Sequence, residues 1–177
     1  MKNQKGFTLV EIAIVLVIIG LLIGALLKGQ EMIKSAKIKR VVKQADELRA
    51  AALTYQDLYR YLPGDDPNGT PAGDGNGQIG TTAEREAFFD HLQAKNLISG
   101  DYSTAANVYP HHAFGGTVWV YWTTVQGKTT HWVQYANMPG EIAQIIDTQY
   151  DDGNYQTGSI RGSAAYTTAA ITLSIEF

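Results

Sequence analysis

The most apolar stretch of the chain lies near its amino terminus. Residues 7–27 form a run of 21 residues in which Glu11 is the only charged side chain. A helix of that length spans about 30 Å, the hydrocarbon thickness of a membrane. The run therefore predicts a membrane-spanning helix. A cleaved secretory signal beginning at Lys2 and Lys5 is the alternative, but the run is longer than an ordinary signal core and no clean small-residue cleavage site follows it.

Beyond the apolar run, hydrophobic residues recur every three or four positions. Residues 28–61 contain no proline, and Gly29 is their only glycine. This pattern predicts one face of an amphipathic helix. With the apolar run it makes a single helix of about 50 residues, roughly 80 Å long, which Leu62-Pro63-Gly64 ends. The face comprises Ile38, Val41, Val42, Ala45, Leu48, Ala52, Tyr55 and Tyr59.

Two further helices are predicted in residues 62–177. Thr81-x-x-Glu84 has the spacing of a capping box and predicts a helix that ends near Asn96. Pro139 suits the first residue of a short helix. The residues of this short helix expected to face inward are Ile142, Ile145 and Ile146.

The same region predicts a small antiparallel sheet. Thr117–Val125 and Thr129–Ala136 are rich in β-branched and aromatic residues, and Gln126-Gly127-Lys128 joins them, which indicates a hairpin. Ala164–Ile175 predicts a closing strand. The fold class is therefore α+β, with a long amino-terminal helix packed on a small antiparallel sheet.

Glu11 needs an explanation, because a carboxylate inside a membrane span costs a few kcal/mol. It lies only four residues into the apolar run. Its side chain could therefore extend to the nearby interface and serve no further purpose. A partner of opposite charge is the other explanation.

The residues around Glu11 carry a resemblance to a known family. Lys5-Gly6-Phe7-Thr8-Leu9-Val10-Glu11, followed by the apolar run, resembles the amino terminus of type IV prepilins and type II secretion pseudopilins. The resemblance implies that a prepilin peptidase cuts between Gly6 and Phe7 and methylates the new amine of Phe7. It also implies a pilin-like fold whose subunits pack by their apolar helices into a filament.

The resemblance also implies a division of the chain. The expected parts are a leader peptide (1–6), a transmembrane and assembly half of the helix (7–27), an amphipathic half (28–61) and a globular head (62–177). Many type IV pilins have a proline near the end of the apolar run, where this sequence has Leu27-Lys28-Gly29. Melting of the helix during assembly would therefore depend on Gly20, Gly24 and Gly29.

Within this resemblance Glu11 is the fifth residue of the mature chain. Its carboxylate can neutralise the Phe7 amine of the next subunit. Because a broken buried pair would cost several kcal/mol, this pair would favour the correct axial register between neighbouring subunits. Glu11 also lies one turn from Phe7 of its own chain. The sequence leaves both pairings open.

Charge divides the chain unevenly. Residues 1–60 carry ten Lys and Arg against five Asp and Glu, whereas residues 61–177 carry four against twelve, a net charge of −8. The acidic part argues against nucleic-acid binding, which needs Lys and Arg at phosphates.

Six basic residues follow the span within residues 28–43, whereas two precede it. The positive-inside rule therefore places the carboxyl side in the cytoplasm. The family resemblance implies the opposite orientation, since long domains translocate largely regardless of charge. We expect a single-pass inner-membrane precursor with a periplasmic head. The resemblance implies that it meets an inner-membrane assembly platform and enters a periplasmic or extracellular filament.

A glycine-rich acidic loop follows the long helix. Its middle, Asp74-Gly75-Asn76-Gly77-Gln78-Ile79, resembles that of an EF-hand loop, but Ala72 and Ala83 occupy the first and last ligand positions. A full EF-hand is therefore excluded. A looser oxygen cage for Ca²⁺ and a loop of Asx turns without an ion both stay open. The oxygen-bearing side chains are Asp65, Asp66, Asn68, Asp74 and Asn76.

A second acidic loop is a rival ion site. Asp147, Asp151 and Asp152 flank Gly153-Asn154. Major pseudopilins are known for calcium in a late loop, so the resemblance makes this the alternative metal site.

The sequence offers no enzyme motif. There is no cysteine, no G-x-S-x-G, no P-loop and no G-x-G-x-x-G, and the histidines lack an H-x-x-x-H spacing. The four histidines are His91, His111, His112 and His131. We therefore expect no enzymatic activity.

A structural subunit of a type IV pilus-like filament or of a type II secretion pseudopilus is the function that these features favour. One alternative is a minor pilin that acts as a surface adhesin through an aromatic face of its head, although these rings also suit sheet packing. The aromatic residues are Trp119, Tyr121, Trp122, Trp132 and Tyr135. Another alternative is a membrane-anchored sensor or enzyme, which predicts no cleavage at Gly6.

Overall fold

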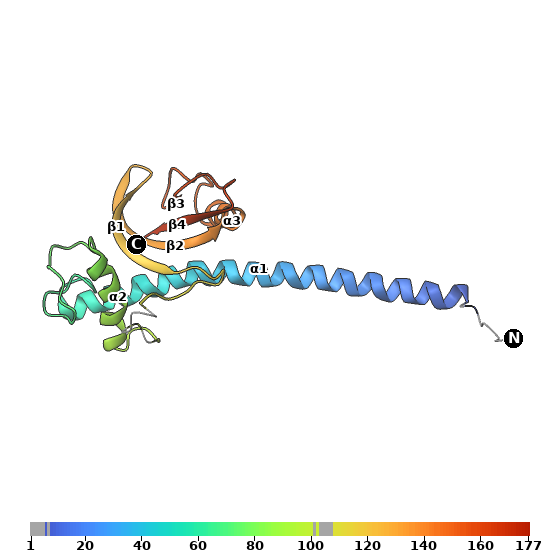
Figure 1. Cartoon of the computed structure of the whole chain (residues 1–177), viewed down its shortest axis with the longest axis horizontal. Coiled ribbons are helices and arrows are strands. Elements are labelled where there is room, and N and C mark those ends of the chain that lie inside the picture. The colour runs from blue at the N-terminus through green and yellow to red at the C-terminus, as the bar shows by residue number, and fades with distance from the viewer. Residues whose placement is uncertain (1–5, 7, 101, 103–107) are drawn as a thin grey trace. The chain divides into compact units, whose positions relative to one another are not determined.

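The computed structural model describes residues 6, 8–100, 102 and 108–177. It divides into two compact units, Met1–Lys37 and Ile38–Phe177, and the first helix contributes to both (Figure 1). The elements are α1 (Leu9–Tyr59), α2 (Thr82–Ala94), β1 (Val118–Val125), β2 (Lys128–Pro139), α3 (Gly140–Tyr150), β3 (Ile160–Gly162) and β4 (Ala170–Glu176). The predicted α+β class is confirmed.

The described part of the first unit is dominated by the apolar half of α1. Its large side chains are open to solvent, from 46% exposed at Ile19 to 88% at Leu9. An 18-residue window of this half has a mean hydropathy of 3.0 and none of it is buried. By length and composition the helix can cross a membrane. The helix that the apolar run predicts is therefore present.

In the second unit, one face of the remaining part of α1 packs against the hydrophobic core of that unit. The predicted periodic face is confirmed, except that Val42 is only partly buried and Tyr59 is 36% exposed. Polar contacts also connect this helix to the sheet: Tyr135 Oη donates to the carbonyl of Val41 over 2.9 Å. The buried residues of the helix are Ile38, Val41, Ala45, Leu48, Ala51, Ala52 and Tyr55.

The helix ends at Tyr59, two residues before the predicted end. Arg60 follows with φ at 70°, and its N–H donates to the carbonyl of Gln56 over 2.8 Å. A residue in this left-handed conformation is a common helix terminator, and the proline at position 63 cannot continue the helix.

The sheet has four antiparallel strands in the order β1-β2-β4-β3. The predicted hairpin is present, with a two-residue turn at Gln126 and Gly127, whose φ values are 47° and 81°. Two positive φ values indicate a type I′ turn, whose twist suits a hairpin. Figure 1 shows β1 and β2 curving together as a pair.

Three boundaries in the sheet region differ from the prediction. Lys128 is the first residue of β2 rather than part of the turn. Pro139 ends β2 with ψ at 132° and precedes α3, because β2 continues past a bulge to pair with β4. The predicted closing strand is present as β4 but begins at Ala170 instead of Ala164, because residues 163–169 form bends and a turn; the short strand β3, which was not predicted, lies before them and pairs with β4.

Capping explains why α2 has the limits that the sequence predicts. Thr81 and Glu84 form the capping box at its start. At its end Asn96 has φ at 56°, Asn96 N–H donates to Gln93, and Leu97 N–H donates to Leu92 over 2.9 Å. These two bonds form a Schellman motif, with Asn in the position that glycine usually occupies.

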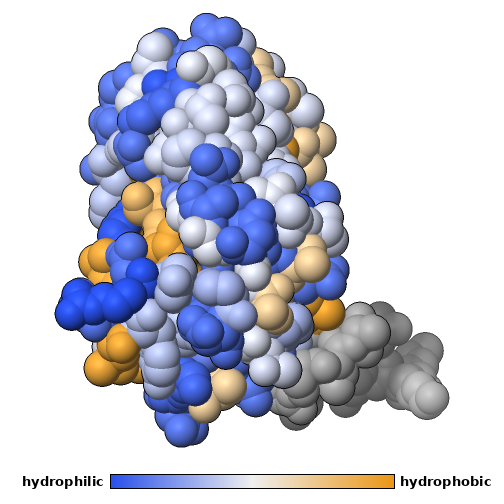
Figure 2. Space-filling model, turned by 90° about the vertical axis from the view of Figure 1, so that its left-hand side faces the viewer, coloured by the Kyte–Doolittle hydropathy of each residue, from blue (hydrophilic) through white to orange (hydrophobic). Residues whose placement is uncertain are grey.

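The core of the second unit lies between α1, α2, α3 and one face of the sheet. Its largest fully buried members include Tyr55, Tyr135, Phe88, Phe89 and Met138. The outer surface visible in Figure 2 is mainly hydrophilic to intermediate, with hydrophobic residues in small separate groups.

Candidate functional site

The first turn of α1 holds Glu11 in a capping box. Thr8 precedes the helix, and its backbone N–H and its hydroxyl both donate to Glu11 Oε2, over 2.7 and 2.8 Å. In return the N–H of Glu11 donates to Thr8 Oγ1 over 3.2 Å. This reciprocal pattern satisfies donors at the helix start that the helix itself leaves free. The carboxylate is therefore aimed at the amino-terminal end of the helix.

Sequence reasoning missed Thr8. The signal was present, because Thr8-x-x-Glu11 has the same spacing as Thr81-x-x-Glu84. Gly6 is exposed, and a side chain added there would meet nothing within 4 Å. Phe7 lies outside the described residues, so the two predicted pairings of Glu11 with its amine stay open.

The glycine-rich loop brings Asp65 and Asp74 together, and Glu84 joins them. Each offers a carboxylate oxygen, and these oxygens lie within 4.8 Å of one another. Asp65 accepts bonds from the N–H groups of Asn76 (3.0 Å) and Gly77 (2.8 Å). Burial raises the pKa of Asp65, and the neighbouring carboxyls of Asp74 and Glu84 raise it further, although the two backbone bonds oppose the shift.

The other predicted ligands of this loop have different positions. Asp66 is buried and accepts from the hydroxyl of Tyr55 and from the N–H of Asn68, both over 2.8 Å. Asn76 donates from its side-chain amide to Asp74 over 2.8 Å. The sequence predicted only a capping role for Glu84. In the structure its Oε2 accepts from the N–H groups of Gly80 and Thr81, and its carboxylate also lies near Asp65 and Asp74.

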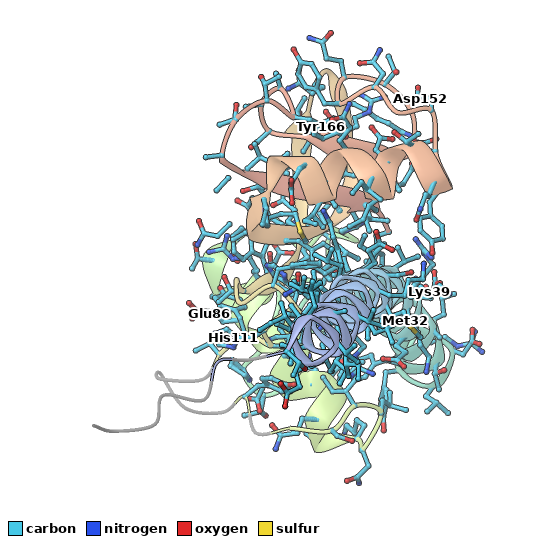
Figure 3. The ribbon with its side chains drawn as sticks, turned by 90° about the vertical axis from the view of Figure 1, so that its right-hand side faces the viewer. Met32, Lys39, Glu86, His111, Asp152 and Tyr166 are labelled. Atoms are coloured by element: carbon cyan, nitrogen blue, oxygen red, sulfur yellow. The ribbon has the colours of Figure 1, made fainter. Side chains whose placement is uncertain are left out.

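The late acidic loop brings its three predicted residues together. Oxygens of Asp147, Asp151 and Asp152 lie within 4.8 Å of one another at the end of α3. Tyr166 donates its hydroxyl to Asp147 over 2.5 Å, and Figure 3 shows Asp152 and Tyr166 beside α3. Burial raises the pKa of Asp147, and Asp152 and Asp151 raise it further, while bonds from Tyr166 and Gly153 lower it.

Both groups present carboxylate oxygens, the ligands that Ca²⁺ prefers. Each carboxylate also accepts hydrogen bonds from its own loop, as Asp151 does from the N–H groups of Ser159 (2.6 Å) and Ile160 (2.7 Å). The donor sets therefore suit a hard cation, and calcium binding stays a prediction.

Three of the histidines are engaged by the backbone. His91 accepts from the N–H of Gly64 over 2.9 Å and contacts the Pro71 carbonyl, and His112 contacts the Ala136 carbonyl over 2.8 Å. Nε2 of His131 accepts from the N–H of Ile79 over 3.1 Å, and burial lowers the pKa of His131 to about 4. These contacts fix loops against the sheet and α2.

The five aromatic residues singled out in the sequence do not share one surface. Trp132 and Tyr135 are fully buried, whereas Trp119, Tyr121 and Trp122 are partly exposed. Packing therefore accounts for the first two. Trp119 and Tyr121 point to the same side of β1, because side chains two residues apart on a strand share a face.

Comparison with known proteins identifies the start of the chain. Residues 1–27 match the family model described as the prokaryotic N-terminal methylation motif. The chain therefore carries the leader and apolar helix start that are typical of type IV pilin and pseudopilin precursors, as its residues predict. Searches of curated proteins and of solved structures gave no match.

Proposed function

We propose that this protein is a structural subunit of a type IV pilus-like filament or of a type II secretion pseudopilus, made as a prepilin. The observation that carries the proposal is the capped Glu11 at the start of an exposed apolar helix, within the residues that match the methylation motif. A helix that is apolar on all sides needs lipid or other helices around it. A filament core supplies those helices after the subunit leaves the membrane.

The residues of the first turn have separate roles in this proposal. A prepilin peptidase cuts after Gly6 and methylates the amine of Phe7. Thr8 holds the Glu11 carboxylate toward that end of the helix, so the charge is already oriented when the amine of a neighbouring subunit arrives. Pairing of the two charges then offsets the cost of burying each of them.

The second unit belongs to the outer layer in this proposal. The acidic residues of 61–177 suit a surface that stays in water, whereas the six basic residues within 28–43 follow the apolar run in sequence. The head is periplasmic before assembly, the precursor stays in the inner membrane as a single-pass protein, and the assembly platform there extracts it. The filament is then periplasmic or extracellular.

Substitution at the cleavage position tests the proposal. Gly6→Glu should block the cut, because the residue before the cut must be small to fit the peptidase. We expect intact mass spectrometry of membranes containing a prepilin peptidase to show only the longer precursor. Gln4→Glu is the matched control, since it adds the same charge to the leader without filling the cleavage position, and it should be processed normally.

A mature mass that is unchanged in Gly6→Glu would contradict the prepilin assignment. It would favour a membrane-anchored protein with no role in a filament.

A further inference from the structure

One cation of residues 61–177, Arg85, borders a cavity and has no carboxylate partner among the residues that the structure describes. Among the four basic residues of 61–177, Lys128 pairs with Glu176 over 2.7 Å, Arg161 donates to three carbonyls, and Lys95 lies over the ring of Tyr59. Arg85 on α2 is the fourth. Within the part of the chain that the structure describes, no carboxylate lies within 4.0 Å of its guanidinium nitrogens.

Aromatic rings hold the Arg85 side chain in place. Its guanidinium carbon lies 5.5, 5.4 and 5.2 Å from the ring centroids of Tyr109, Trp119 and Tyr121. Nε donates to the hydroxyl of Tyr109 over 2.9 Å. The two terminal nitrogens make no hydrogen bond to any residue that the structure describes. Cation–π contacts therefore orient the group while its outer donors stay available.

The cavity next to Arg85 has the lining of a small-molecule site. It measures about 360 Å³, which lies within the usual range for ligand pockets. Trp119 and Tyr121 supply partly exposed ring surface, and hydroxyl and amide groups surround them. The Trp119 ring is fixed, because its Nε1 donates to Gln134 Oε1 over 2.7 Å. The polar side chains of the lining are Thr123, Thr124, Gln126, Gln134 and Ser163.

We propose that this cavity binds a saccharide that carries one carboxylate, of the uronic acid class. The planar guanidinium of Arg85 donates two parallel hydrogen bonds to the carboxylate, the bidentate geometry in which these two groups commonly pair. The rings of Trp119 and Tyr121 cover the apolar face of the sugar, and the hydroxyl and amide groups of the lining bond its hydroxyls.

The net negative charge of residues 61–177 favours a ligand with a single carboxylate over a more highly charged ligand. Residues 61–177 have a net charge of −8, so a polyphosphate or nucleic acid is repelled. A single guanidinium without a carboxylate partner among the described residues compensates one negative group. The site lies wholly in the second unit and does not depend on processing or filament assembly, so it is independent of the proposed function.

Titration of the full-length protein in detergent tests the proposal. D-Galacturonate should quench the tryptophan fluorescence saturably, and D-galactose, which lacks the carboxylate, should bind about 10- to 100-fold more weakly. Arg85→Gln should weaken galacturonate binding by a similar factor. Lys95→Gln is the matched control, because it removes another α2-adjacent cation that also lies over a ring, and it should bind as the wild type does.

Three results would overturn the proposal: no saturable binding of galacturonate, equal affinity for galactose, or equal loss in Arg85→Gln and Lys95→Gln. The two-sugar comparison on the wild type stands alone if Arg85→Gln fails to fold. A change of oligomeric state in Arg85→Gln without galacturonate binding by the wild type would assign the cavity to contact between copies instead.

Discussion

Glu11 carries an energetic cost as well as the pairing role proposed for it, and its bonds to Thr8 limit that cost within the chain. An unpaired carboxylate in an apolar run is unfavourable by a few kcal/mol. Two donors of Thr8 reduce that penalty within the chain itself, over 2.7 and 2.8 Å. The carboxylate is thus already oriented by its own chain in the absence of a neighbouring subunit.

Substitutions at these two residues separate the charge from its orientation. Glu11→Ala should be held more stably in the bilayer and yet yield few filaments, because the amine of a neighbour then has no partner. Thr8→Val removes a cap worth about 1 kcal/mol and should lower the yield several-fold, whereas Thr8→Ser keeps the hydroxyl and should assemble normally. The measurement is the mass of sheared filaments at equal expression. Normal yield from Glu11→Ala would rule out the pairing role.

At the scale of single residues, the sequence predicted the charged residues of these sites more reliably than the residues that lie next to them in the fold. Glu11, Asp74 and Asp147 were identified because a carboxylate in an apolar run or a crowded loop is conspicuous. Glu84 was not expected near Asp65, since the two are distant in sequence and only the folded loop brings them together. Long-range proximity of this kind has no local signature.

Turns and caps set the limits of the secondary-structure elements. The type I′ turn at Gln126-Gly127 and the Schellman motif at Asn96 are local devices, and both elements that they end were predicted within a few residues. The strand β3 was missed because three residues carry almost no periodic signal, and its identity depends on pairing with β4.

Gly140 shows how closely α3 approaches its neighbouring loop. A Cβ at this position would collide with the carbonyl oxygens of Tyr166 and Thr168. Gly140→Ala should therefore destabilise the second unit by about 2 kcal/mol, as overpacking of a buried site does. Gly80→Ala is the control, because a Cβ there meets nothing within 4 Å, and it should change stability by less than about 0.5 kcal/mol.

Thermal unfolding followed by near-ultraviolet circular dichroism measures both variants in the full-length protein. Equal melting temperatures for Gly140→Ala and the wild type would mean that the loop moves away from α3 without cost.

For the molecule as a whole, the sequence predicted the class of fold and the division of chemistry along the chain. The apolar run, the periodic helix and the acidic remainder are properties of composition and period, which need no knowledge of tertiary contacts. The cavity beside Arg85 was not predicted, because α2, β1 and the residues near Ser163 contribute to it from distant parts of the sequence. The aromatic residues were noticed, but their separation into buried and exposed groups required the folded sheet.

The two acidic groups share a property that affects the stability of the whole second unit. Each gathers three carboxylates whose oxygens lie within 4.8 Å of one another. Two charges about 4 Å apart repel each other by about 1 kcal/mol even in water. Burial and neighbouring carboxylates raise the pKa of Asp65 and of Asp147. A raised pKa favours the protonated carboxyl, and protonation removes one of the repelling charges. A divalent cation would relieve it without protonation.

Calcium should therefore raise the melting temperature of the full-length protein in detergent, because a ligand that binds only the folded state stabilises it by mass action. At 100 times the dissociation constant the gain is about 2.7 kcal/mol, which corresponds to roughly 5–10 °C for a chain of this size. Magnesium should give a smaller rise, since it requires stricter octahedral geometry.

Asp74→Asn and Asp152→Asn each remove one charge from one loop, and the variant that loses the calcium shift identifies the loop that holds the ion. Identical melting in calcium and in chelator would exclude both loops as calcium sites, and the hydrogen bonds within each loop would then account for its conformation without an ion.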